Sequence, residues 1–162
     1  MPQLPTGFTW KKSAETLVVG HDQGSAFTPI LLPGTRFSAT REVREGPRDV
    51  LAPLNLYEKG FEDRGWVETS RAGSFMLAPV VADGPDGNEW SHFYLKEKLI
   101  RAVILSSQRE TTCNDDSLSP EQLKTCQKEH PTYSESVSIF VSDAVPVETL
   151  AACLGKPHPS CP

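Results

Sequence analysis

The sequence lacks a long apolar run. No stretch approaches the ~18 consecutive apolar residues that a membrane-spanning helix requires, so we expect no membrane span in this chain. The first ten residues, MPQLPTGFTW, have neither the basic region nor the apolar core with which a signal peptide begins. Two interpretations stay open: a cytosolic protein, or a mature form that has lost a signal peptide and, with it, any lipid anchor.

Positive charge is also scarce. The 162 residues contain 16 Lys and Arg against 21 Asp and Glu, which gives a formal net charge of −5. Nucleic acids and anionic membranes are bound through clustered Lys and Arg. The basic cluster between Arg36 and Arg48 is interrupted by acidic residues. We therefore expect no nucleic-acid partner and no membrane-surface partner.

The usual catalytic signatures are missing as well. The chain contains no G-x-S-x-G, H-E-x-x-H, S-x-x-K, P-loop or G-x-G-x-x-G motif. Glu58 and Glu62 are one helical turn apart, but Lys59 and Arg64 are close by and we expect both carboxylates to be solvated. The acidic residues of 83–89 do not follow the EF-hand order, and their Asp-Gly pairs are typical of a hairpin loop. The sequence thus predicts no catalytic residue, no cofactor and no metal.

What the sequence does contain is four cysteines, all in its last third. They are Cys113, Cys126, Cys153 and Cys161. An even number of cysteines in polar or proline-rich segments favours disulfides. Each sequential pair closes a short local loop, and loop closure removes entropy from the unfolded chain. We predict the pairs Cys113–Cys126 and Cys153–Cys161, and hence a periplasmic or secreted protein, because disulfides persist in oxidising compartments.

Other cysteine chemistry fits the spacing less well. Twelve and seven residues separate the cysteines of the two pairs, whereas zinc knuckles use C-x2–4-C and thioredoxin-type redox sites use C-x-x-C. His130 and His158 lie near the cysteines, so a Cys/His zinc site stays open as an alternative.

Two helix signals stand out. In residues 46–66, Val50, Leu54, Tyr57 and Phe61 recur at helical spacing, and Pro53 either begins this helix or kinks it. Within the first cysteine pair, residues 119–122 (SPEQ) form a capping box with proline at the first helical position. This box predicts a helix over about 120–127, with Cys126 in its last turn.

The remaining segments are mostly strand-like. We expect an irregular arm over residues 1–15, a turn at Pro33-Gly34 after an apolar strand, and a closing helix over 145–155. Glu97-Lys98 is short enough to link two strands as a hairpin. Predicted strands are residues 16–20, 26–34, 35–43 (at a sheet edge), 66–70, 74–82, 89–96, 99–108 and 136–142. The order predicts a single α+β domain over residues 1–162: one antiparallel meander, with a main helix and a C-terminal helix on one face, and a disulfide-closed excursion over 109–135.

Part of this order resembles a family. LLPGTR (31–36), LNLYEKGFEDRGW (54–66) and LKEKLIRAVILSS (95–107) are similar to a pattern of small bacterial lipoproteins and periplasmic domains. In that pattern, a Pro-Gly turn precedes a helix with Y…GW and then a β-meander. The resemblance covers residues 31–108, with Phe61 where the pattern usually has Leu, and it leaves the cysteine-bearing third outside. It implies a location in the cell envelope and no catalytic residues.

One candidate binding surface emerges from the strand over 89–96. Trp90, His92 and Tyr94 fall on one face because side chains alternate along a strand. An exposed aromatic ladder with a histidine could bind a ligand or partner. The alternative is that one of the helices covers this face.

These observations favour a non-catalytic binding or accessory protein whose partner is another protein. An inhibitor or immunity factor that presents an acidic surface to a secreted enzyme or toxin is the first alternative. A small secreted hydrolase is the second, and it would require His, Asp or Glu side chains that converge in space.

Overall fold

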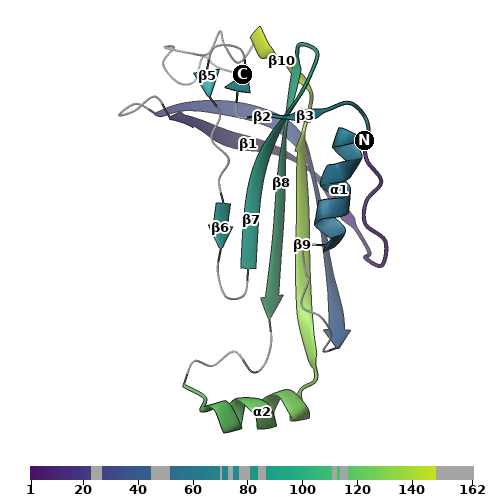
Figure 1. Ribbon diagram of the computed structural model, residues 1–162, viewed down its shortest axis with the longest axis vertical. Coiled ribbons are helices and arrows are strands. Elements are labelled where there is room, and N and C mark those ends of the chain that lie inside the picture. Colours follow the sequence, from purple (N-terminus) through teal and green to yellow (C-terminus); the bar gives the residue numbers. More distant parts are fainter. Residues whose placement is uncertain are drawn as a thin grey trace.

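The structure is a computed structural model that describes residues 1–22, 27–44, 52–69, 71–72, 75–76, 81–83, 87–110, 113 and 117–148. Its main feature is an eight-stranded antiparallel sheet, with strand order β1-β2-β9-β8-β7-β3, β6 beside β7 and β10 beside β8. Two helices complete this α+β fold (Figure 1). The elements are β1 (Lys11–Asp22), β2 (Phe27–Arg44), α1 (Ala52–Glu62), β3 (Val67–Glu68), β4 (Arg71–Ala72), β5 (Phe75–Met76), β6 (Val81–Asp83), β7 (Gly87–Lys96), β8 (Leu99–Glu110), α2 (Pro120–Glu129), β9 (Thr132–Ser142) and β10 (Val145–Pro146).

The centre of the sheet forms where the sequence alternates most clearly. Glu97 has a positive φ of 56° in the two-residue link between β7 and β8, which confirms the predicted hairpin. On β9, Val137, Ile139 and Val141 are buried on the face toward α1. The residues between them face the opposite side, because a strand has a two-residue period.

Helix α1 covers the apolar face of the sheet. Leu54, Tyr57 and Phe61 are 1–2% exposed and pack against the buried side chains of β7, β8 and β9. Pro53 is the second residue of α1, so it begins the helix rather than kinks it. The predicted apolar face is confirmed for these three residues, whereas Val50 lies outside the described residues.

The predicted turn at Pro33-Gly34 is wrong, because β2 continues through both residues. A Cβ atom at Gly34 would lie 2.4 Å from the carbonyl oxygen of Val141, so glycine allows β9 to approach closely. Pro33 accepts a hydrogen bond from the amide of Asp143 and lies one residue beyond the β2–β9 ladder, which begins at Gly34 and Ser142. Its missing N–H therefore breaks no bond of that ladder. The Pro-Gly pair marks the end of a pairing rather than a reversal of the chain.

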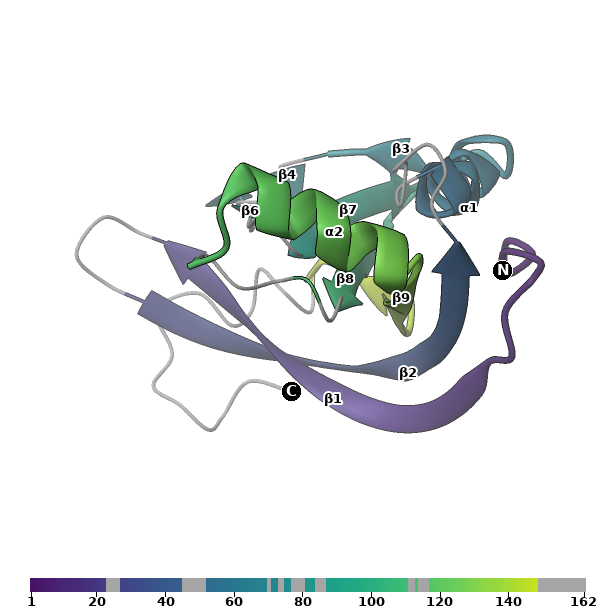
Figure 2. The same cartoon turned by 90° about the horizontal axis from the view of Figure 1, so that it is seen from below.

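The N-terminal arm is also shorter than predicted. Strand β1 begins at Lys11 and forms the edge of the sheet beside residues 35–38, so the predicted edge strand over 35–43 is internal there and pairs with β9 alone over residues 39–43. Before β1, the lead-in packs against the core through Leu4, Phe8 and Trp10. Seen from below, β2 curves toward the side on which α1 lies (Figure 2). The curved strand and the lead-in together enclose the apolar face.

Three predictions at the other end of the chain need adjustment. The excursion is narrower than residues 109–135, because β8 extends to Glu110 and β9 begins at Thr132. The predicted strand over 74–82 is described only as β5 and β6. The predicted closing helix over 145–155 is wrong at Val145–Pro146, which pairs with β8 as β10, whereas Val147 and Glu148 are helical. Residues 149–162, with Cys153 and Cys161, lie outside the described residues.

The close approach at Gly34 can be tested by Gly34→Ala. We expect a loss of about 1–3 kcal/mol in the free energy of unfolding, because the new methyl group meets backbone atoms that cannot move aside. Urea denaturation measures the change. Ser38→Ala, on the same strand, is the control and should differ little from the parent. An unchanged unfolding midpoint for Gly34→Ala would contradict the close approach.

Candidate functional site

The clearest cluster of polar side chains surrounds His92 on β7. Its Nδ1 atom lies 2.6 Å from Oε1 of Glu68, and its Nε2 atom lies 3.3 Å from Oε1 of Glu58. The hydroxyl of Tyr94 donates a hydrogen bond to the same oxygen of Glu58, also at 3.3 Å. We call these four residues the His92 cluster. It joins α1, β3 and β7.

Strand pairing explains how Glu68 reaches this cluster. Glu68 pairs in register with Tyr94 across β3 and β7. His92 lies two residues along β7 on the same face, so it is a diagonal neighbour of Glu68. The imidazole is therefore held from one side by the sheet and from the other by the helix.

Of the predicted aromatic ladder, the structure describes the side chains of His92 and Tyr94, and their surroundings differ. Tyr94 is 1% exposed and stacks on Phe61 of α1 with ring centroids 5.2 Å apart, so its ring is not available to a ligand. The side chain of His92 is 21% exposed and stays accessible. The side chain of Trp90 lies outside the described residues. At Tyr94, helix α1 covers this face of β7, which is the alternative to an exposed binding surface.

The prediction that the carboxylate of Glu58 is solvated is wrong, because this side chain is largely buried. Its side chain is 21% exposed, and burial raises its pKa, an effect that the charge of His92 and the hydrogen bond from Tyr94 partly offset. The sequence contained a signal for this position. Glu58 follows Leu54 by four residues and precedes Phe61 by three, which places it beside the apolar stripe of α1. Charge alone suggested solvent, whereas helical spacing indicates the core side.

The geometry of the His92 cluster favours a proton on Glu58. Both nitrogens of His92 face carboxylate oxygens, and burial raises the pKa of Glu58. A protonated Glu58 can supply the hydrogen for its contact with His92. Removing that proton takes away one of the two contacts.

This arrangement limits the chemistry of the cluster. The convergence of a histidine and two carboxylates meets part of the condition for a hydrolase. However, each ring nitrogen already lies beside a carboxylate oxygen, at 2.6 and 3.3 Å. Within the described parts of the chain, no group of three or more His, Cys, Asp or Glu side chains could hold a metal ion. The cluster is suited to fastening α1 and β3 to β7 through a shared proton.

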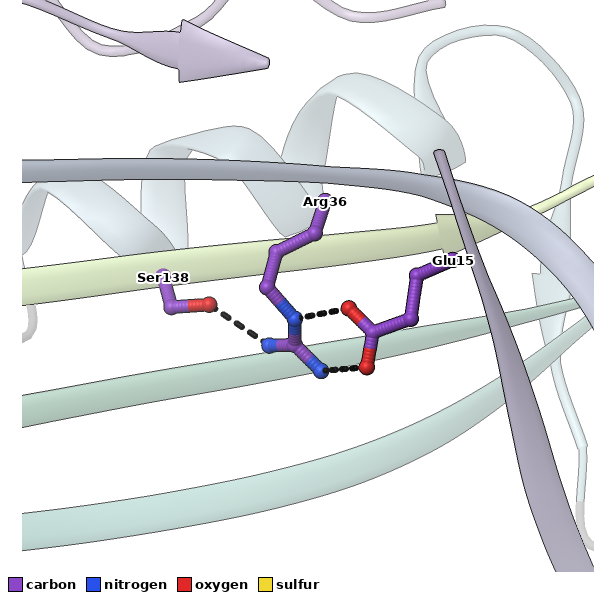
Figure 3. A network of polar contacts seen from close by, with 3 residues as sticks. All are labelled: Glu15, Arg36 and Ser138. Carbon is purple, nitrogen blue, oxygen red and sulfur yellow. Dashed lines mark hydrogen bonds and ion pairs between the residues drawn. The ribbon is translucent and has the colours of Figure 1, made fainter. Parts of the chain in front are cut away.

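A second polar network lies on the opposite face of the sheet (Figure 3). The guanidinium of Arg36 donates to both carboxylate oxygens of Glu15, and its third nitrogen lies 2.6 Å from Oγ of Ser138. It also lies over the ring of Phe140, 5.6 Å from the centroid. The network links β1, β2 and β9, and hydrogen bonding to Arg36 lowers the pKa of Glu15. Its role is to hold the edge strand on the sheet.

The third feature is the disulfide-closed excursion between β8 and β9. The disulfide Cys113–Cys126 is present, as predicted, and Cys126 is in the last turns of α2. Ser119 and Gln122 form the predicted capping box, with Pro120 at the start of the helix. Helix α2 lies below the ends of β8 and β9, far from α1 (Figure 1). None of its ten residues is buried.

Comparison with known proteins adds no relative. No family model, no curated protein and no solved structure matches the chain. The resemblance to small bacterial lipoproteins and periplasmic domains therefore stays a prediction.

The shared proton of the His92 cluster can be tested by Glu58→Gln. The pKa of Glu58 is raised above its ordinary value of 4.5, so folding takes up protons and the stability that depends on this proton falls as pH rises through the folded-state pKa. Glutamine does not titrate, so we expect a flatter dependence of unfolding free energy on pH from 4.5 toward neutrality. Urea denaturation at several pH values provides the measurement. Glu62→Gln, one turn further along α1, is the control. Equal slopes for the parent and Glu58→Gln would refute the shared proton.

Glu15 should show the opposite dependence. Its pKa is lowered, so the stabilisation from the Arg36 pair is present above 4.5 and is lost as pH falls through the folded-state pKa. We expect Glu15→Gln to lose roughly 0.2–1 kcal/mol at neutral pH, the range for exposed ion pairs, and to match the parent at acid pH. Thermal melts across this range would measure both, with the exposed Glu42→Gln on β2 as control. A loss that persists at acid pH would speak against the ion pair.

Proposed function

We propose that this is a non-catalytic binding protein of an oxidising compartment that contacts another protein through α2. The observation that supports the proposal is that α2 is kept helical although none of its side chains is buried. Most helices in proteins owe their stability to an apolar face packed on a core. In α2 only Leu123, Cys126 and Gln127 are even partly buried, so its shape serves something other than the core.

Several local interactions stabilise the helix instead. An isolated helix of fewer than ~12–15 residues is marginal in water, and α2 has ten residues. The capping box satisfies backbone amides at its start, and Pro120 fixes the first helical φ. The disulfide from Cys126 to Cys113 ties its last turns to the end of β8. Such rigidity lowers the entropy cost of association, which is the usual benefit of a preorganised contact element.

The disulfide also supports the proposed compartment. Disulfides persist in secreted and periplasmic proteins and are rare in the cytosol. Among the described residues, no helix is long and apolar enough to cross a membrane. We therefore propose the periplasm, the wider cell envelope or the exterior as the site of action.

The charge of α2 bears on the kind of partner. The helix has two acidic residues, Glu121 and Glu129, and two basic ones, Lys124 and Lys128. A balanced helix does not present the acidic surface on which the inhibitor alternative depends. That alternative gains no support from α2 and stays a prediction.

Site-specific photo-crosslinking tests the proposal. A photoreactive amino acid replaces Lys124 or Lys128 of α2 in the full chain, and the chain is expressed in its native host. Because one partner covers the helix, both positions should give the same adduct by mass spectrometry. The same substitution at Lys59, exposed on α1, is the control and should not give it.

A second variant separates helix shape from helix sequence. Cys113→Ser with Cys126→Ser removes the disulfide but no charged residue. We expect α2 to lose its protection from hydrogen exchange, the sheet core to keep its protection, and the adduct to disappear. An adduct that persists undiminished, or one that forms only from Lys59, would exclude α2 as the contact element.

A further inference from the structure

Arg101 on β8 occupies an unusual position for a charged side chain. It pairs in register with Tyr94, on the face that α1 covers. Its guanidinium lies over the ring of Trp66, 5.1 Å from the centroid. This cation–π contact orients the charge but supplies no hydrogen-bond acceptor.

The hydrogen bonding of Arg101 is incomplete. Its Nε atom is buried, and it is the one buried side-chain nitrogen or oxygen without a partner in the described part of the chain. Its Nη1 atom donates to the sulfur of Met1 at 3.1 Å, and a thioether is a weak acceptor. No carboxylate of the described residues lies within ion-pair distance of it, although Asp143 acts on it from further away. Burial correspondingly lowers the pKa of Arg101.

Neighbouring cations are better satisfied than Arg101. Arg64 donates to the carbonyl of Gly60, and Lys96 donates to the carbonyl of Arg64, both at the C-terminal end of α1. Helix C-termini attract cations in this way, so these two need no further partner. Among the described residues, the sulfur of Met1 is the acceptor that Arg101 has, and no backbone carbonyl accepts from it. Burial raises the pKa of Tyr57, and the positive charges of Arg101 and Arg64 partly offset this effect.

We propose that Arg101 and Trp66 form a binding site for a small oxyanion, such as a carboxylate or phosphate group. The oxyanion takes the place of the Met1 sulfur at Nη1 of Arg101. Met1 is 59% exposed, so its side chain can move away without uncovering the core. The ring of Trp66 holds the guanidinium in place, and the charge of Arg64 adds to the attraction. This site is separate from α2 and does not depend on the proposed partner contact.

The test observes the Arg101 side chain directly in the full-length protein. Arginine Nε–H groups give resolved signals in proton–nitrogen correlation spectra, and contacts with the Trp66 ring assign the signal of Arg101. Sodium phosphate and sodium acetate are titrated separately, and sodium chloride is added to keep the ionic strength constant. We expect the Arg101 signal to move and to saturate with a dissociation constant on the order of 1 mM, as for a site with few charge-assisted hydrogen bonds.

The same spectra contain the matched controls. The Nε atoms of Arg36 and Arg41 already bind carboxylates of Glu15 and Glu135, so their signals should stay in place. Saturation with phosphate alone identifies a phosphate group, and saturation with acetate a carboxylate. We also expect the bound oxyanion to change the fluorescence of Trp66 in the parent, and Arg101→Lys should abolish this change. An Arg101 signal that does not move, or that drifts without saturation together with those of Arg36 and Arg41, would overturn the proposal.

Discussion

The two-residue alternation of β9 is the constraint on which the rest of this structure depends. Val137, Ile139 and Val141 face α1, while Ser136, Ser138 and the buried Phe140 face the other side. β9 lies between β2 and β8, so both neighbours must match its register. A slip of one residue would turn the apolar set to the wrong face. Helix α1 covers this face, and its buried side chains pack against those of β9.

The same face explains why the N-terminal lead-in is ordered. Glu135 precedes the apolar residues of β9 on their own face and is 2% exposed, so its charge needs a partner. Arg41 of β2 supplies it at 2.6 Å, and Phe8 of the lead-in stacks on that guanidinium at 4.1 Å. A buried carboxylate without its partner costs about 3–5 kcal/mol. The lead-in thus shields a necessary ion pair and is not a free arm.

Sequence reasoning succeeded where the deciding signal was local. The apolar stripe of α1, the Glu97-Lys98 hairpin, the capping box of α2 and the Cys113–Cys126 disulfide each depend on residues close together in the chain. It failed at Pro33-Gly34, where the partner that needs the glycine is a strand more than a hundred residues away. It also failed at Glu58, because the two residues that contact this carboxylate, His92 and Tyr94, lie far along the chain on β7 and meet it only when α1 packs on the sheet. Distant pairing cannot be read from spacing, and polar clusters depend on it.

The three polar features differ in what they require of the fold. The His92 cluster and the Arg36 network each connect separate elements, so a substitution in either affects folding and any local function together. Helix α2 differs from both, because its capping box and disulfide are local and it contributes no buried side chain to the core. Changes at its exposed positions therefore leave the sheet core intact. A segment whose stability is independent of the core can vary its surface at little cost to folding, and this freedom is the physical reason to look for recognition at α2.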